Sequence, residues 1–356
     1  MRPLRVTIVG FGTVGRWLAS AIQRHGSWLA TERGVRVSIV GVANRRDGFV
    51  YREAGFDIAE LVERAAARQP LADYPGVRRW ETALAGLAQT ETDVLAEASG
   101  ANPRDPEPAL RHIRQALGRG AHVITSSKGA CAAAGVELLA LARRHGLQCR
   151  MESTVMSGTP TLSTIQEGLA GARVLAIRGI LNGTANHILT LMAQGLDYAA
   201  ALSDAQAQGY AEPDPTDDVE GHDVVAKARI LAAIAFGRVV GLNQVVRRGI
   251  TGITPEAIRE AAREGRRIKL VATLLPKATD GAASIEARVE PMALSPDDPL
   301  SRIDGAMNAL VIRTDPVSEV AIVGPGAGPE QAGQGMFADL VAVAATVPGR
   351  ATTRTT

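Results

Sequence analysis

The sequence predicts an α/β protein with an N-terminal doubly wound parallel sheet and a second, α+β domain after it. An apolar strand pattern over Arg5–Gly10 runs directly into glycines at positions 10, 12 and 15, and helical periodicity follows over Arg16–His25. Buried strand patterns and amphipathic helices then alternate to about residue 150, which is typical of a parallel sheet. After Pro160 this alternation ends, and 356 residues exceed the usual size of one core.

The glycines of the first turn are spaced as in a Rossmann-type dinucleotide-binding fold. Gly10 permits the tight turn, Gly12 lets the pyrophosphate approach the backbone, and Gly15 lets helix and strand pack closely. The phosphates are then expected on the free N–H groups of the following helix, which adds Thr13 and Val14 to the candidate contacts. A purely structural glycine turn is the alternative.

Four segments are expected along the chain. Residues 1–150 form the dinucleotide-binding domain, and residues 151–318 form a domain for substrate binding, catalysis and oligomerisation. Residues 319–346 return to the cofactor domain, and the polar residues 347–356 form a disordered tail.

The end of the second strand, predicted over Val35–Ala43, normally separates NAD from NADP. An acid there binds the ribose 2′-hydroxyl, whereas an arginine suits the 2′-phosphate. The chain has Arg45 and Arg46 at this point, and Asp47 follows two residues too late. We therefore expect NADP, with Arg45 as the phosphate contact and Arg46 as its helper, although a basic loop tip without ligand is the alternative. His25–Gly34 is expected to be an inserted loop.

Two further strand ends contribute candidate residues to the predicted ligand crevice. A charged helical segment over Tyr51–Arg79 precedes a strand over Thr92–Ala98, which ends at Ser99, a candidate neighbour of the cofactor. A strand over Ala121–Thr125 is followed by Lys128 at a helix start. Desolvation or a nearby cation would lower the pKa of this lysine and fit it for proton transfer.

An acidic block in the second half of the chain carries a candidate catalytic pair. Pro213 and Pro215 predict a loop over Ala211–Gly221, and helical spacing begins at His222. Asp223 and Lys227 are then one helical turn apart, where their side chains can meet. The pattern does not fit a calcium loop, but a surface ion pair is the alternative. The acids of the block are Glu212, Asp214, Asp217, Asp218, Glu220 and Asp223.

The stretches GILNGTANHILTLM (179–192) and GYAEPDPTDDVEGHDVVAK (209–227) resemble the substrate-binding core of homoserine dehydrogenases. The resemblance covers most of the chain and is to the short form without a regulatory domain. It implies NAD(P)H-dependent reduction of L-aspartate 4-semialdehyde to L-homoserine and the reverse, a step in threonine, methionine and isoleucine biosynthesis.

The resemblance also implies roles for residues of this chain. Glu212 and Asp223 would bind the substrate, Lys227 would transfer the proton, and Lys128 would be a second cation in the crevice. Which lysine is the acid stays open, because their titrations would be coupled. The remaining substrate contacts implied are Asn182, Gly183, Thr184 and Asp218.

Two glycine-rich turns depart from the family pattern. In the first, the family can hold a sodium or potassium ion, and the positions in this chain are Glu152, Val155, Ser157 and Thr159. Met156 and Ser157 replace glycines there. In the second, Gly326 would contact the cofactor, but Pro329–Gln331 replaces the usual small residues. Ser127, before Lys128, replaces the usual asparagine.

Composition limits the other classes of function. Thirty-nine basic and 37 acidic residues give a net charge of +2, which indicates neither a nucleic-acid nor a membrane partner. The N-terminal apolar run is short and broken by glycine, so we expect a cytoplasmic protein. Cys131 and Cys149 are expected to be buried small residues. The resemblance implies a homodimer or homotetramer that binds a small-molecule substrate.

Two rival functions share parts of this sequence pattern. An aspartate-semialdehyde dehydrogenase needs a nucleophilic cysteine, and Cys131 lacks the accompanying histidine and asparagine context. A catalytically altered relative that acts on another amino acid, or binds NADP as a sensor, is the remaining alternative.

Overall fold

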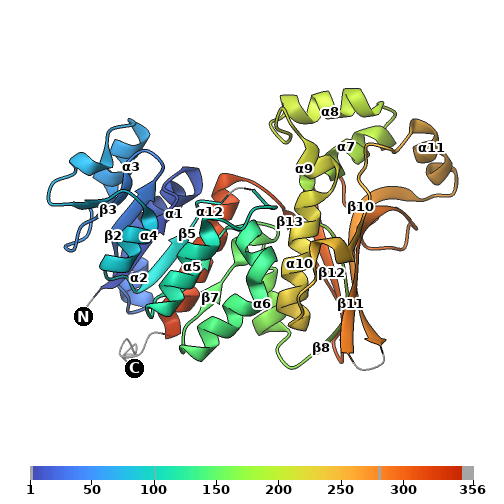
Figure 1. The fold of residues 1–356 in the computed structure, drawn as a ribbon. Helices are drawn as coiled ribbons and strands as arrows, with labels where there is room; N and C mark the ends of the chain where they lie inside the picture. The colour runs from blue at the N-terminus through green and yellow to red at the C-terminus, as the bar shows by residue number, and fades with distance from the viewer. Residues whose placement is uncertain (1–2, 101, 280–281, 347–356) are drawn as a thin grey trace. The chain divides into compact units, whose positions relative to one another are not determined.

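A computed structural model describes residues 3–100, 102–279 and 282–346 (Figure 1). The chain forms two compact units. Unit 1 contains residues 1–158 together with 329–356, and unit 2 contains residues 159–328. The tail expected at 347–356 lies outside the described residues.

Unit 1 is built on a seven-stranded sheet with the order β4-β3-β2-β1-β5-β6-β7. Strands β2, β1, β5, β6 and β7 are parallel, whereas β3 and β4 pair antiparallel at one edge. The strands are β1 Leu4–Val9, β2 Val37–Asn44, β3 Gly48–Tyr51, β4 Arg78–Trp80, β5 Val94–Glu97, β6 His122–Thr125 and β7 Cys149–Arg150. The order outward from β1 in both directions is that of a doubly wound Rossmann-type sheet.

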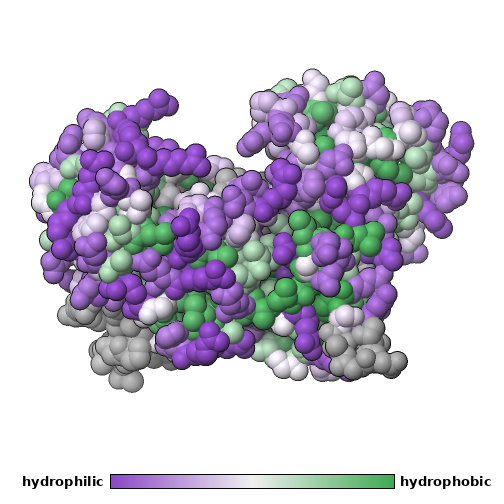
Figure 2. All heavy atoms as spheres, viewed as in Figure 1, coloured by the Kyte–Doolittle hydropathy of each residue, from purple (hydrophilic) through white to green (hydrophobic). Residues whose placement is uncertain are grey.

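The helices of unit 1 include one that comes from the end of the chain. They are α1 Thr13–Arg24, α2 Gly26–Glu32, α3 Ile58–Ala66, α4 Ala83–Gln89, α5 Ala109–Gly118, α6 Lys128–Arg144 and α12 Pro329–Thr346. Short 3₁₀ turns lie at η1 Leu71–Asp73 and η2 Glu152–Thr154. Hydrophilic residues predominate over the α3 end of this unit (Figure 2).

Helix α12 is an integral part of the core of unit 1. Its residues Met336 and Leu340 are fully buried in the same cluster as Leu18 of α1 and Ile8 of β1. Each such side chain contributes about 1.5–3 kcal/mol by its burial. Helices α1 and α12 approach closely at Gly333, where a Cβ would lie 2.3 Å from the ring of Trp17. The close approach therefore requires a residue without a side chain.

Unit 2 has a six-stranded sheet with the order β13-β12-β8-β10-β11-β9. All neighbours are antiparallel except β11 and β9. The strands are β8 Arg173–Ile180, β9 Val245–Arg247, β10 Arg267–Thr279, β11 Ala282–Leu294, β12 Met307–Asp315 and β13 Ser318–Pro325. A buried cluster that includes Ile180, Val271 and Val311 covers part of this sheet.

The helices of unit 2 include those that carry the acidic block. They are α7 Gly183–Ala193, α8 Tyr198–Ala207, α9 Thr216–Val219, α10 His222–Phe236 and α11 Pro255–Arg263, with a π-helical turn η3 at Thr164–Gly168 and a 3₁₀ turn η4 at Leu242–Gln244. No helix in the described part of the chain has the length and apolar character needed to cross a membrane. Both cysteines are buried and unbridged, as expected.

Several predicted elements differ from the structure in unit 1. The stretch Tyr51–Arg79 is helical only in α3, which Asp57 caps by accepting a hydrogen bond from the Glu60 amide. Its two ends are strands, because Tyr51 of β3 pairs with Arg78 of β4. The expected inserted loop at His25–Gly34 contains helix α2.

One segment of unit 2 also differs, since the expected loop at 211–221 contains the helical turn α9. The unit boundaries differ from the expected domains as well. Unit 1 extends past residue 150 to Gly158, and β13 keeps residues 319–325 in unit 2, so that only α12 belongs to unit 1.

Candidate active site

The predicted pair in the acidic block of unit 2 is formed and buried. Lys227 Nζ lies 2.7 Å from Asp223 Oδ2, and each side chain is less than a tenth exposed. The same ammonium donates a 2.6 Å hydrogen bond to the main-chain carbonyl of Leu181 at the end of β8. The alternative of a surface ion pair is therefore wrong, since a buried ammonium requires such close partners.

Local conformation sets the position of this pair. Gly221 has a φ of 77° and lies between α9 and α10, a left-handed conformation that glycine adopts without strain. Helix α10 thus begins at His222 and carries Asp223 in its first turn, where a negative charge is favoured by the helix dipole. Lys227 follows one turn later on the same helix face.

Asn182 connects the pair to the acidic loop. Its amide Nδ2 donates hydrogen bonds of 3.1 Å to Asp223 Oδ2 and 2.6 Å to Asp218 Oδ1. Its Oδ1 accepts from the Ala185 amide at 2.8 Å and so caps helix α7. One side chain therefore fixes a helix start and two carboxylates beside Lys227.

The other predicted substrate contacts lie around this centre. Gly183 leaves no room for a Cβ, which would lie 2.5 Å from the Ala306 carbonyl oxygen. Thr184 is buried and donates from Oγ1 to the Tyr210 carbonyl at 2.6 Å. Glu212 is exposed, and its carboxylate has no hydrogen-bond or ion-pair partner among the described residues. The structure thus brings together Lys227, Asp223, Asn182 and Asp218 by direct bonds and leaves Glu212 at the surface.

In unit 1, the three glycines of the first turn have distinct surroundings. Gly10 has a φ of 93°, and a Cβ there would lie 2.3 Å from the Ala98 carbonyl carbon. A Cβ at Gly15 would lie 2.5 Å from the Gly10 carbonyl oxygen. A Cβ at Gly12 would meet no atom within 4 Å, and Gly12 and Thr13 are exposed. The turn is therefore tight on the protein side and open at Gly12, which fits a dinucleotide phosphate.

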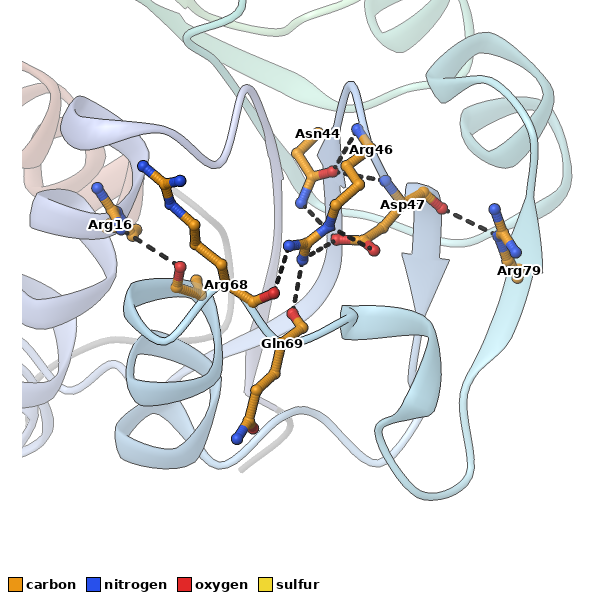
Figure 3. A network of polar contacts seen from close by, with 8 residues as sticks. Arg16, Asn44, Arg46, Asp47, Arg68, Gln69 and Arg79 are labelled. Atoms are coloured by element: carbon orange, nitrogen blue, oxygen red, sulfur yellow. Dashed lines mark hydrogen bonds and ion pairs between the residues drawn. The ribbon is translucent and has the colours of Figure 1, made fainter.

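The two arginines in the turn after β2 differ in their contacts. Arg46 donates hydrogen bonds to the Asp47 carboxylate at 3.0 and 3.2 Å and to the carbonyls of Arg68 and Gln69 at 2.5 and 2.6 Å (Figure 3). Arg45 is exposed, and its side chain makes no hydrogen bond or ion pair with any described residue. Arg46 is thus a structural clamp, while Arg45 is available to a ligand.

Asp47 is enclosed in this network and is 4% exposed. It accepts from Asn44 Nδ2 at 2.8 Å as well as from Arg46. Burial alone would raise the pKa of its carboxyl, but these hydrogen bonds outweigh that effect and lower the pKa below its usual value. Its carboxylate is therefore ionised but occupied within the turn.

Ser99 and Lys128 follow neighbouring parallel strands, β5 and β6. The Ser99 amide and Oγ donate to Glu97 Oε1 at 2.7 and 2.5 Å, and Glu97 Oε2 lies 2.7 Å from His112 Nδ1. Lys128 is half-buried at the start of α6. Ser127 before it is 1% exposed, and its Oγ has no partner among the described residues. An unpaired buried hydroxyl at this strand edge also fits a site for a bound polar group.

Two family models match the chain, homoserine dehydrogenase over residues 160–341 and the NAD-binding domain of homoserine dehydrogenase over residues 10–152. The chain belongs to the homoserine dehydrogenase family. An NAD(+)-dependent homoserine dehydrogenase of Pseudomonas canavaninivorans is 40% identical over 96% of this chain and 96% of its own. The homoserine dehydrogenase of Methanocaldococcus jannaschii is 34% identical over 94% of this chain and 97% of its own.

Solved structures agree with this assignment to the homoserine dehydrogenase family. The crystal structure of a putative homoserine dehydrogenase from Archaeoglobus fulgidus matches with a TM-score of 0.83 and 31% identity, covering 96% of this chain and 99% of that one. A hyperthermophilic archaeal homoserine dehydrogenase in complex with NADPH matches with a TM-score of 0.81 and 29% identity, covering 98% of this chain and 99% of that one. The protein is thus an oxidoreductase of this family with a domain for a nicotinamide cofactor, and the sensor alternative is not favoured.

The glycine replacements in the first family turn keep a glycine-like backbone. Met156 and Ser157 have φ values of 57° and 54°, a conformation that costs a residue with a side chain about 1–2 kcal/mol. Glu152 is 4% exposed, and its amide donates to Asp339 Oδ2 at 2.9 Å. A Cβ at Gly335 of α12 would lie 2.5 Å from the Ser157 carbonyl oxygen. Packing of α12 therefore holds this strained turn in place.

The four candidate cation ligands are divided between the units. Glu152, buried Val155 and Ser157 belong to unit 1. Thr159 belongs to unit 2, where its carbonyl accepts a 2.9 Å bond from Thr161 Oγ1. The described residues contain no group of three or more histidine, cysteine or acidic side chains suited to a metal ion. An ion at this turn would therefore rest mainly on main-chain oxygens.

Three buried polar residues were missed by the sequence analysis. Glu97, with 0% exposure, carries the signal of an acid inside an apolar strand pattern. Asp339 and Asn308 carry no local signal, since their surroundings come from distant parts of the chain. Gly326, a predicted cofactor contact, lies in unit 2, where a Cβ would fall 2.0 Å from Asn308 Nδ2.

Proposed function

We propose that this protein catalyses the NAD(P)-dependent interconversion of L-aspartate 4-semialdehyde and L-homoserine, and that it prefers NADP. The buried pair of Lys227 and Asp223, bridged by Asn182 to Asp218, is the observation that carries this proposal. It combines one cation with two carboxylates, a set suited to a substrate that bears an ammonium group and a carbonyl oxygen that must gain a proton.

Each side chain has a distinct role in this proposal. Lys227, held between Asp223 and the Leu181 carbonyl, gives a proton to the oxygen that becomes the homoserine hydroxyl. Asp223 keeps the Lys227 ammonium in place, and Asn182 in turn holds the Asp223 carboxylate. The exposed carboxylate of Glu212 attracts the ammonium group of the substrate. Lys128 is the second cation that orders the carbonyl. The bound nicotinamide supplies the hydride.

The preference for NADP rests on the turn after β2. Arg45 is exposed without a partner among the described residues, so its guanidinium can bind a 2′-phosphate. The Asp47 carboxylate, which follows two residues too late for the usual contact with the ribose hydroxyls of NAD, is also buried against Arg46 and Asn44. One relative is named for NAD(+) and one solved neighbour holds NADPH, so both cofactors occur among similar proteins.

The first test is the initial rate of L-homoserine oxidation with NADP and, separately, with NAD, followed at the nicotinamide absorbance. Turnover with NADP preferred supports both parts of the proposal. Turnover with NAD preferred keeps the activity and refutes the role of Arg45. Binding of NADP without turnover refutes the activity and supports the sensor alternative.

A second test separates catalysis from folding in unit 2. Lys227→Ala should abolish turnover while NADP binding persists, since Lys227 is assigned to proton transfer. Lys269→Met is the matched control, because Lys269 is a 2% exposed lysine bonded to Asp304 and Asn186. The control should lose stability without a specific loss of kcat. A near-normal rate for Lys227→Ala would remove Lys227 from the mechanism.

Three further assignments belong to this proposal. A sodium or potassium ion is assigned to the turn at Glu152, which predicts activation by one of these salts over a choline control. A homodimer or homotetramer is assigned from the family resemblance, and light scattering of the purified protein measures it. A biosynthetic role assigns the enzyme to the cytoplasm.

A further inference from the structure

Glu97 is a buried acid whose carboxylate is surrounded by hydrogen-bond donors. It is 0% exposed and ends the parallel strand β5 of unit 1. Its Oε1 accepts from both the amide and the hydroxyl of Ser99, at 2.7 and 2.5 Å, and its Oε2 lies 2.7 Å from Nδ1 of the buried His112. An apolar residue in this strand would avoid the cost of burying a carboxylate, which favours a functional reason for the acid.

The carboxylate of Glu97 fixes the direction of the Ser99 hydroxyl. A carboxylate accepts hydrogen bonds but donates none, so the hydroxyl proton of Ser99 points to Glu97. The amide N–H of Ser99 is directed to the same oxygen. Ser99 therefore offers only the lone pairs of its Oγ to a further partner. It can accept a hydrogen bond from a hydroxyl or an amide, but it cannot donate one to a phosphate.

Ser99 lies against the glycine turn, within the same unit. It is half-buried, and a Cβ at Gly10 would fall 2.5 Å from its amide nitrogen. Strand β5 lies on one side of β1, and β2 lies on the other. The phosphates belong to the turn after β1, and the adenosine half of the cofactor is assigned to Arg45 after β2. The nicotinamide riboside half therefore extends toward β5 and Ser99.

We propose that Glu97 is a cofactor-positioning residue, which holds Ser99 as an acceptor for a donor group on the nicotinamide riboside half. This inference rests on the proposed function for the identity of the cofactor and for the place of its adenosine half. The riboside half carries donors in its ribose hydroxyls and its ring carboxamide, whereas an ionised phosphate carries none. The hydrogen bond to Ser99 thus sets how far the cofactor extends along the strand ends, and with it the position of the ring.

The test is a double-mutant cycle on NADP binding with Ser99→Ala, Glu97→Met and the double variant. Methionine keeps about the volume of Glu97 and removes the acceptor, so that the Ser99 hydroxyl is no longer held. We expect each single variant to bind NADP about tenfold more weakly, as for the loss of one hydrogen bond. The double variant should bind about as weakly as either single variant, because Glu97 acts through Ser99.

Two fragments of the cofactor show which group Ser99 binds. 2′-phospho-ADP lacks the nicotinamide riboside, and Ser99→Ala should bind it as tightly as wild type does. 2′-phospho-ADP-ribose keeps the ribose and lacks the ring. A loss of affinity for this fragment in Ser99→Ala assigns the hydrogen bond to a ribose hydroxyl, whereas an unchanged affinity assigns it to the ring carboxamide.

Asp339→Asn is the matched control. Asp339 is also a buried acid of unit 1 that accepts from a main-chain amide and from a side chain. Its substitution should change the melting temperature without weakening NADP relative to 2′-phospho-ADP.

Three results would overturn the inference. Unchanged NADP binding by Ser99→Ala would leave its Oγ to water, and this variant removes a single oxygen atom, so the result is available even if Glu97→Met does not fold. A hundredfold loss in the double variant would show that Glu97 acts independently of Ser99. Equal weakening of 2′-phospho-ADP, together with a lower melting temperature, would make Glu97 a purely structural residue. The titrations need no turnover, so wild-type protein that binds NADP but fails to oxidise homoserine refutes the proposed activity alone.

Discussion

Asp339→Asn should change how the stability of unit 1 depends on pH. Asp339 is 2% exposed on α12 and accepts hydrogen bonds from Arg150 Nε at 3.0 Å and from the Glu152 amide at 2.9 Å. Burial raises the pKa of its carboxyl from 3.8 to about 7, although the charge of Arg150 and the Glu152 amide oppose this rise. Asparagine has nearly the same shape and does not titrate.

The direction follows from proton linkage. Below about pH 4 the carboxyl is protonated in both the folded and the unfolded chain, so its titration costs nothing. Between pH 4 and 7 the unfolded chain releases the proton while the folded chain retains it, and the free energy of unfolding falls as pH rises. The pKa values of the unfolded and folded states differ by about three units, at roughly 1.4 kcal/mol each, so the loss in the free energy of unfolding is at most about 4 kcal/mol.

The fluorescence of tryptophan measures this effect in the relevant unit. All three tryptophans, Trp17, Trp28 and Trp80, belong to unit 1, as does Asp339. Urea unfolding followed by tryptophan emission should show that the stability of wild type relative to Asp339→Asn decreases from pH 4 to pH 8. Asp73→Asn, at an exposed position of unit 1, is the matched control. A difference between wild type and Asp339→Asn that stays constant over this range would refute the reasoning.

Four other substitutions test the two units. Gly10→Ala should prevent unit 1 from folding, since its Cβ would lie 2.3 Å from the Ala98 carbonyl carbon. Gly12→Ala should keep the wild-type melting curve and weaken NADP binding, because a Cβ there meets no atom within 4 Å. Equal melting curves for the two variants would contradict these expectations. Lys227→Arg keeps the positive charge but cannot release a proton at neutral pH, so kcat should fall at least 100-fold, as expected for loss of general acid catalysis, while KM changes little. Arg45→Asp should move the ratio of kcat/KM from NADP toward NAD by about tenfold or more, as expected for loss of a charged contact, and an unchanged ratio would exclude Arg45 from the cofactor site.

Local patterns in the sequence were sufficient for the centre of the site. The spacing of Asp223 and Lys227 predicted their contact because residues four apart on a helix lie on one face. The turn of Gly10 was likewise predicted because the requirement for a positive φ lies within a few residues. Both features depend only on neighbours along the chain.

Features that depend on distant partners were not predictable in this way. Arg46 was expected to help bind a phosphate, but its guanidinium is occupied by carbonyls more than 20 residues away, at Arg68 and Gln69. Asp339 meets Arg150 across 189 residues of sequence. The strand β3 was missed because a four-residue strand beside a charged helix has too short a pattern to distinguish.

The division of unit 1 between the two ends of the chain has a consequence for its synthesis. The ribosome makes the seven strands of the unit first, then the whole of unit 2, and only afterwards α12. Until then the surface that receives Met336 and Leu340 has no cover, and a nascent chain in this state exposes apolar groups that favour aggregation. Folding of the cofactor sheet is therefore completed only when the last helix emerges, and a chain that ends before it should depend on chaperones.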